Sequence, residues 1–261
     1  MKNNVVWVEI LLIAVFIGLI FRWINVKADG GVKYIAIVID DFGNNSKGTE
    51  EMLNLPIKFT GAVMPLMPYS DEESQRLKAM DKEVILHQPM QAHTGSRSWL
   101  GPVPILSDMS MEETIQQFNQ NVDSLNPIGF NNHMGSLITE DKEKMQAILS
   151  IAKSKNMFFV DSVTTSKSVA EKAANEIGVP YIKRDVFLDS TQDISKIKDN
   201  IYKTAKIADE KGYALAIGHV GAEGGVCTAQ ALKDTYKQLQ NKNYQFVTVS
   251  ELLSKIKSSQ H

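Results

Sequence analysis

Short runs of β-branched and aromatic residues alternate with amphipathic stretches along most of this chain, and this alternation constrains the fold more than any other feature. Runs with strand character lie at 34–39, 59–64, 83–86, 129–131, 158–160, 180–183, 214–217 and 245–249. Helical patterns lie at 70–80, 111–125, 141–155, 169–177, 194–211 and 229–242. This alternation is typical of βα units that build a parallel sheet. It predicts an α/β fold.

The spacing of these units favours a closed or nearly closed parallel barrel, with an open doubly wound sheet as the alternative. The chain has 261 residues, and no break in composition divides the part that follows the N-terminal segment. We therefore expect residues 29–261 to form one domain.

The N-terminal segment is strongly apolar. A run at 5–21 is interrupted only by Glu9 and Gly18, and basic residues flank it on both sides. Its length lies between the hydrophobic region of a signal peptide and a full membrane span of about 20 residues. We expect residues 1–28 to be a signal peptide or an N-terminal membrane anchor, and the remainder to be exported from the cytoplasm.

Charge and cysteine content exclude several classes of function. A formal net charge of −2 provides no basic excess for phosphate groups, so we expect no nucleic-acid partner. Cys227 is the only cysteine, which excludes an intramolecular disulfide and a cysteine-rich zinc site. Neither a glycine-rich phosphate loop nor a Gly-x-Ser-x-Gly elbow is present, so nucleotide use and a serine hydrolase are unsupported.

Chemically capable side chains follow the predicted strands, at the point where each strand ends. These residues are Asp40, Asp41, His87, His133, Asp161, Arg184, Asp185 and His219. An aspartate after a strand is often only a helix cap, but six strand ends with such groups are harder to explain in that way. In a parallel barrel the carboxyl ends of all strands meet on one face. The pattern therefore predicts a single site.

Imidazoles and carboxylates are suited to metal-assisted hydrolysis. Together they bind Zn²⁺ or a similar divalent ion and leave a position open, where bound water loses a proton more readily than in bulk. A second carboxylate and a further histidine can then act as base and acid. Asp40 and Asp41 are adjacent and would point to opposite sides of an extended strand, so the chain must bend there if both face the site.

Seven short motifs, in this order, resemble those of the polysaccharide deacetylases with a NodB-like fold, and in particular their divergent branch. They lie at 37–43 (IVIDDFG), 86–90 (LHQPM), 99–102 (WLGP), 131–136 (NNHMGS), 159–162 (FVDS), 184–189 (RDVFLD) and 217–219 (IGH). The resemblance covers roughly residues 33–253.

The resemblance implies a distorted (β/α) barrel of about seven parallel strands that removes N- or O-acetyl groups from a carbohydrate or cell-envelope polysaccharide. It also implies a divalent metal, with zinc as the expected ion. By position, Asp40 resembles the catalytic base and His219 the general acid, while Asp41 and His87 resemble metal ligands. Asp161 and Arg184 would orient or tune their neighbours.

One position departs from the family pattern. The ordinary family has a second metal histidine four residues after the first, and this chain has Gln91 there. His133 is the expected substitute, because the next strand end would bring it to the same face. His93 is the alternative ligand.

Two other functions stay open from the sequence. One is a glycan-binding protein without catalysis, for which Trp99, Tyr69 and Phe187 offer aromatic platforms. The other is a metal-dependent hydrolase of another ester such as a phosphoester, with Lys183 and Arg184 as cations.

Overall fold

A computed structural model describes residues 31–259 of the chain. Residues from Lys33 onward form one compact unit. The segment predicted to be a signal peptide or membrane anchor lies outside the described residues. Within 31–259, no helix is both long and apolar enough to cross a membrane.

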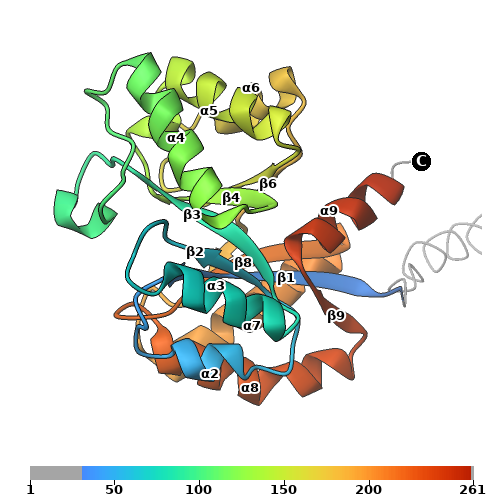
Figure 1. Cartoon of the computed structure of the whole chain (residues 1–261). Helices are drawn as coiled ribbons and strands as arrows, with labels where there is room; N and C mark the ends of the chain where they lie inside the picture. Colours follow the sequence, from blue (N-terminus) through green and yellow to red (C-terminus); the bar gives the residue numbers. More distant parts are fainter. Residues whose placement is uncertain (1–30, 260–261) are drawn as a thin grey trace, which may run out of the picture. The chain divides into compact units, whose positions relative to one another are not determined.

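The fold is built on one curled parallel sheet (Figure 1). Eight strands follow the order β6-β5-β4-β3-β2-β1-β8-β7, and β9 pairs with β1. In chain order the strands are β1 (Lys33–Phe42), β2 (Thr60–Val63), β3 (Glu83–Met90), β4 (Gly129–Met134), β5 (Phe158–Asp161), β6 (Tyr181–Lys183), β7 (Val186–Phe187), β8 (Tyr213–His219) and β9 (Tyr244–Val247). Every pairing between these strands is parallel.

The sheet curls into a half-barrel whose two end strands, β6 and β7, are separated by only two residues of chain. Within the described part of the chain no backbone pairing joins them. The first half of β1 pairs with β9 and its second half with β2, so β1 lies at the centre of the sheet. The distorted barrel of about seven parallel strands is therefore confirmed, with one more strand in the main path and β9 beside β1.

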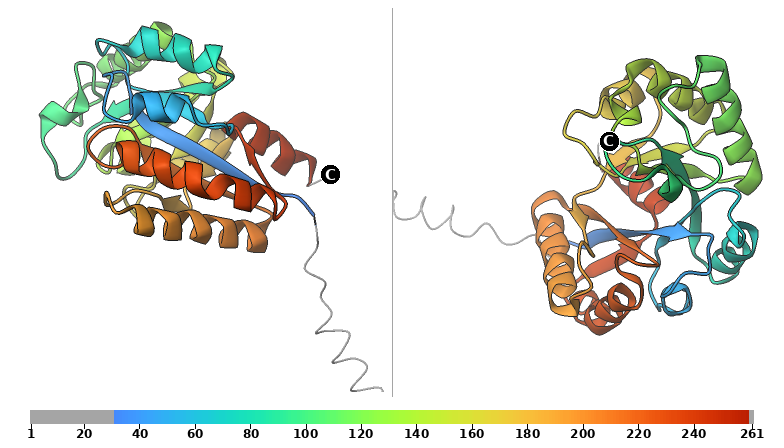
Figure 2. Two further views of the ribbon diagram at one scale, coloured as in Figure 1. Left: turned by 90° about the horizontal axis from the view of Figure 1, so that it is seen from below. Right: turned by 90° about the vertical axis from the view of Figure 1, so that its left-hand side faces the viewer.

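Helices surround the sheet (Figure 2). They are α2 (Thr49–Leu53), α3 (Ser70–Ala79), α4 (Met111–Leu125), α5 (Lys142–Ser154), α6 (Ala170–Ile177), α7 (Ile194–Lys211), α8 (Gly225–Gln240) and α9 (Val249–Ser258), with short 3-10 turns η1 (Arg97–Leu100) and η2 (Ile138–Glu140). Local sequence sets several of their ends. Ser110 and Glu113 form a capping box at the start of α4, and Gly212 ends α7 in a left-handed conformation.

Both faces of the central strand are buried. Ile35, Ile37 and Ile39 pack into one apolar cluster, and the alternating residues Ala36 and Val38 pack into a second. The second cluster also contains residues of α9, so this helix covers part of the second face of β1. Such two-sided burial explains why the strands read as continuous apolar runs.

The sequence located most elements but misplaced some strand ends. Helices at 111–125 and 194–211 agree to the residue. The strand expected at 245–249 ends at Val247, because Thr248 forms a capping box with Glu251 that starts α9. The strands expected to end at Ile39, Leu86 and Asn131 run on to the polar residues that follow, since backbone pairing continues there.

Candidate active site

The two adjacent aspartates lie at a bulge in β1. Pairing with β2 changes register between Ile39 and Phe42, and Asp41 adopts a left-handed conformation with φ of 70°. Aspartate enters this region more readily than most residues. The bulge breaks the alternation of the strand, and both Asp40 and Asp41 line the same cavity. The bend expected from the sequence is therefore present.

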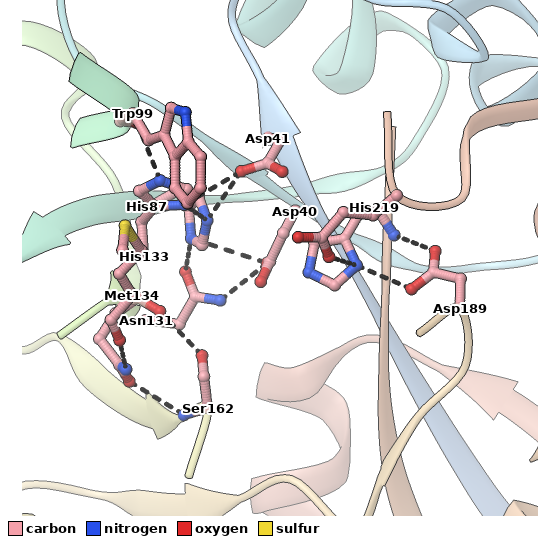
Figure 3. A network of polar contacts seen from close by, with 12 residues as sticks. Asp40, Asp41, His87, Trp99, Asn131, His133, Met134, Ser162, Asp189 and His219 are labelled. Carbon is pink, nitrogen blue, oxygen red and sulfur yellow. Dashed lines mark hydrogen bonds and ion pairs between the residues drawn. The ribbon is translucent and has the colours of Figure 1, made fainter. Parts of the chain in front are cut away.

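Asp41, His87 and His133 form a compact cluster of ligand atoms (Figure 3). Asp41 Oδ1 lies 3.2 Å from His87 Nε2 and 3.2 Å from His133 Nδ1, and the two ring nitrogens are 3.0 Å apart. Ligands at two corners of a tetrahedral zinc site, with metal bonds of 2.0–2.2 Å, are roughly 3.3 Å apart. The three atoms therefore fit one face of such a site and leave its fourth corner open.

In each histidine, the ring nitrogen that faces away from the cluster forms a hydrogen bond that sets the tautomer, and this tautomer can bind a metal. His87 Nδ1 lies 2.7 Å from the Asn131 side-chain oxygen, and His133 Nε2 lies 3.1 Å from the Trp99 carbonyl. Each oxygen can only accept, so these nitrogens carry the protons and the converging nitrogens keep their lone pairs in the neutral rings. The donor set thus suits a divalent cation.

Charge at the cluster also favours a cation. Burial opposes ionisation of Asp41, but hydrogen bonds and charge from His133 and His87 outweigh it and hold the pKa of Asp41 well below its ordinary value. Burial lowers the pKa of His87, whereas Asp40 and Asp41 raise it and prevail. In the metal-free chain a proton therefore competes for the cation position, and metal binding displaces it.

Asp40 is almost completely buried beside this cluster. Burial raises its pKa, while His87 and His219 act in the opposite direction without cancelling the rise. The side-chain amide of Asn131 donates to Asp40 Oδ1 over 2.8 Å, and its oxygen accepts from His87. One amide thus orients both the buried carboxylate and a candidate metal ligand.

His219 forms a second polar centre with Asp189. His219 Nδ1 lies 2.7 Å from Asp189 Oδ1, and the His219 backbone N–H donates to Oδ2 over 2.6 Å. Thr228 donates to the same Oδ2. Burial lowers the pKa of His219, but the hydrogen bond and charge of Asp189, with smaller contributions from Asp40 and Asp41, raise it to about 10. His219 therefore carries a proton at neutral pH.

A cavity of about 570 Å³ joins the two centres. Most of the residues that line it have polar side chains; Met134, Phe187 and Ala222 do not. The lining residues are Asp40, Asp41, His87, Asn132, His133, Met134, Ser162, Thr164, Phe187, Asp189, Ser190, Thr191, Gln192, His219, Ala222 and Glu223. Six of the residues that the sequence singled out thus share one cavity: Asp40, Asp41, His87, His133, Phe187 and His219.

Asp161 and Arg184 lie outside this lining. Asp161 accepts hydrogen bonds from the Val163 backbone, Ser168 and Tyr181, so its carboxylate organises the loop after β5. Arg184 donates to the carbonyls of Ser162 and Val163 and stacks on the Phe187 ring, with 3.6 Å from Cζ to the ring centroid. Arg184 thus contacts Ser162 and Phe187, which line the cavity, and Asp161 contacts the neighbouring Val163.

Gln91 stands where the ordinary family has its second metal histidine, and His93 is the alternative ligand. Both side chains form their contacts outside the metal-ligand cluster. The Gln91 side-chain oxygen accepts from the backbone and the hydroxyl of Ser107, so it ties the ends of the 91–107 loop together. His93 is half exposed and pairs with Glu140 at 3.0 Å. Neither side chain belongs to the three-residue cluster of possible metal ligands among the described residues.

Sequence reasoning missed the roles of Asn131 and Asp189. Both lie in motifs quoted for the family resemblance, Asn131 directly before Asn132-His133 and Asp189 two residues after β7. Their position at the carboxyl ends of strands was the available signal. The identity of their partners, 44 and 30 residues away in the chain, was not.

Comparison with known proteins identifies the class. Residues 37–253 match the family described as divergent polysaccharide deacetylase, and the chain belongs to that family. It is similar to an uncharacterized protein of Haemophilus influenzae, with 32% identity over 71% of this chain and 66% of that protein. The uncharacterized protein YibQ of Escherichia coli is 33% identical over 71% of this chain and 58% of its own length. The matched region is thus less than two thirds of either relative.

Solved structures with little sequence identity share the fold. An uncharacterized protein from Agrobacterium tumefaciens C58 superposes with a TM-score of 0.77 at 17% identity, covering 85% of this chain and 89% of that one. The peptidoglycan deacetylase PdaC from Bacillus subtilis gives a TM-score of 0.52 at 17% identity, over 89% of this chain and 95% of the other. These likenesses establish the architecture, and function is argued from the site.

Proposed function

We propose that this chain is a metal-dependent hydrolase that removes acetyl groups from a carbohydrate or cell-envelope polysaccharide. The observation that carries the proposal is the convergence on one cavity of a metal-ligand cluster (Asp41, His87 and His133), a buried carboxylate (Asp40) and a protonated histidine (His219). Family membership supports the same reaction class.

The roles follow from the contacts of each residue. A divalent metal, expected to be zinc, supplies Lewis-acid polarisation of an acyl group and a more acidic water. Asp40 accepts the proton of the attacking water, and Asn131 holds its carboxylate in place. His219 donates a proton from Nε2 to the departing amine or hydroxyl, because Asp189 occupies Nδ1. The bond from the acyl carbon to nitrogen or oxygen breaks, and acetate leaves.

The cavity lining favours a neutral polar substrate. Hydroxyl and amide side chains form much of the wall, namely Asn132, Ser162, Thr164, Ser190, Thr191 and Gln192. No Lys or Arg is among the described residues that line the cavity, whereas four carboxylates are. Such a lining offers no Lys or Arg to pair with a phosphate group and can hydrogen-bond sugar hydroxyls. A carbohydrate ester or amide therefore suits the cavity better than a phosphoester.

The apolar run at 5–21 supports placing this activity outside the cytoplasm. A single N-terminal hydrophobic segment usually leads to export of the domain that follows it. In this proposal the first 28 residues direct or anchor the chain, and the hydrolase domain faces the cell envelope.

Two substitutions test the chemistry. Asp40→Asn and His219→Ala should each reduce acetate release from acetylated amino-sugar oligomers by about 10²–10⁴-fold, the usual contribution of a positioned base or acid. Metal content should change only slightly. Asp123→Asn and His93→Ala are matched controls, because Asp123 pairs with Lys155 at the surface and His93 lies outside the cavity.

A panel of acetylated glycans with zinc, cobalt or nickel added decides between hydrolysis and binding alone. Metal-dependent acetate release by the parent chain supports the deacetylase. Glycan binding without any metal-dependent release would refute hydrolysis and favour a binding protein on the same fold.

A further inference from the structure

Trp99 belongs to a turn whose backbone contacts the metal-ligand cluster, and its side chain is exposed. Its side chain is 64% exposed, the largest value among the exposed large hydrophobic residues of the described chain. Exposing an indole to water is unfavourable, so a Trp held outward next to a cavity indicates a surface that a ligand covers. A single exposed apolar residue elsewhere on the surface would need no such explanation.

The backbone of Trp99 is attached directly to the site. Its carbonyl oxygen accepts the hydrogen bond of His133 Nε2 over 3.1 Å (Figure 3). Met134, the residue after His133, lines the cavity. The platform is therefore next to the cluster of metal ligands, although Trp99 is not among the residues that line the cavity.

The surrounding turn holds the indole outward. Ser96 caps η1 by accepting from the Ser98 backbone, and Leu100 is buried. Gly95 has φ of 109°, and a Cβ there would lie 2.5 Å from Met134 Cε and 3.4 Å from the Trp99 ring. Glycine thus lets this turn approach Met134 closely. Leu100 anchors the turn while its neighbour Trp99 faces solvent.

We infer that Trp99 is the stacking platform for a second sugar ring of a polymeric substrate, adjacent to the ring whose acetyl group occupies the cavity. This inference rests on the proposed function and names its substrate class. Pyranose rings present C–H faces that pack on aromatic rings, and an indole offers the largest such surface. Trp99 is outside the cavity lining, so this platform would contact a ring beyond the one seated in the cavity and would favour oligomers over a monosaccharide.

Tryptophan fluorescence provides a readout that does not depend on activity. The chain has three tryptophans, at positions 7, 23 and 99. In the full-length chain carrying Trp7→Phe and Trp23→Phe, all tryptophan emission comes from Trp99. Titration with a β-1,4-linked tetramer of N-acetylglucosamine should shift or quench this emission, and the monomer should leave it nearly unchanged.

Substitution then measures the contribution of the ring. Trp99→Ala should weaken tetramer binding by about ten-fold, and Trp99→Phe should weaken it less, while monomer binding stays the same. Zinc affinity should be unchanged, because the carbonyl that accepts from His133 belongs to the backbone. Tyr202→Ala, which removes an exposed aromatic ring from α7 outside the cavity lining, is the matched control.

The outcomes separate this inference from the proposed function. A parent that releases acetate, with Trp99→Ala equal to it in tetramer KM and affinity, would overturn the platform and leave the hydrolase intact. A fluorescence response to the tetramer without acetate release would support the platform and refute hydrolysis. If none of the acetylated oligomers changes the emission of Trp99, the platform is overturned.

Discussion

Replacing Asp189 with asparagine tests how the fold prepares His219 for proton donation. Asp189 is fully buried and accepts hydrogen bonds from the ring, the backbone of His219 and Thr228. Asparagine keeps the shape but removes the charge, and its amide can replace one acceptor with a donor. A donor facing His219 Nδ1 requires that nitrogen to lose its proton. The variant should therefore contain a neutral His219.

The structure sets the size of the effect. A rise in the pKa of His219 from 6.5 to about 10 corresponds to roughly 4–5 kcal/mol in favour of the charged ring. The side chain is only 12% exposed, so solvent screening reduces this little. Asp189 contributes most of the rise, ahead of Asp40 and Asp41. Because burial lowers the pKa once Asp189 no longer outweighs it, we expect Asp189→Asn to remove this preference of roughly 4–5 kcal/mol and to bring the pKa of His219 to about 6.5 or lower.

The substitution should lower both the rate of acetate release and the stability of the fold. The effect on rate grows as the pH rises from 6 to 7.5, whereas the effect on stability shrinks as the pH rises. At pH 7.5 less than about a tenth of His219 would be protonated, so the rate should fall at least ten-fold relative to the parent, and the ratio should narrow as the pH is lowered toward 6. The raised pKa stabilises the folded parent fully below about pH 6.5 and progressively less as the pH rises through about 10. The stability difference between parent and variant should therefore shrink over that interval.

Imidazole NMR titration, pH–rate profiles for acetate release and urea unfolding at several pH values measure these effects. His219→Ala assigns the resonance. Asp185→Asn is a matched control, because Asp185 is a partly buried carboxylate in the same region that bonds Lys211 and the Leu215 backbone without lining the cavity. If His219 titrates at the same pH in Asp189→Asn as in the parent, the assignment of Asp189 as the source of the shift is wrong.

Three further predictions concern the remaining parts of the site and the placement of the chain. His133→Ala should lower zinc occupancy at least ten-fold by elemental analysis, whereas His93→Ala should leave it unchanged; the reverse result would make the loop histidine the ligand. Asn131→Ala leaves the buried Asp40 without its amide donor, so it should cost about 1–3 kcal/mol in the free energy of unfolding, measured by urea titration. A loss no larger than that of a surface Asn→Ala change would contradict this role. Reporter fusions after His261 should register outside the cytoplasm, and cytoplasmic reporter activity in intact cells would refute export.

Periodicity and local chemistry were sufficient for the α/β class, and the spacing of the units favoured a barrel over an open doubly wound sheet. The alternation of apolar runs with amphipathic stretches depends on which faces are buried, and this is written into each segment independently. The placement of Asp40, His87, His133 and His219 on one face also followed from the sequence, because parallel strands bring their carboxyl ends together. Ordered motifs carried the family resemblance, which the family match confirmed.

The direction in which each side chain points was decided only by the tertiary structure. Asp161 and His219 both end strands, yet Asp161 turns into the loop after β5 while His219 lines the cavity. At Asp40 and Asp41 the sequence required only a bend. Its left-handed form, the amide of Asn131 between two distant residues and the buried pairing of Asp189 with His219 are absent from local patterns. They depend on strands that meet only after folding, because a hydrogen bond is specified by the positions of both partners and one segment of sequence describes a single partner.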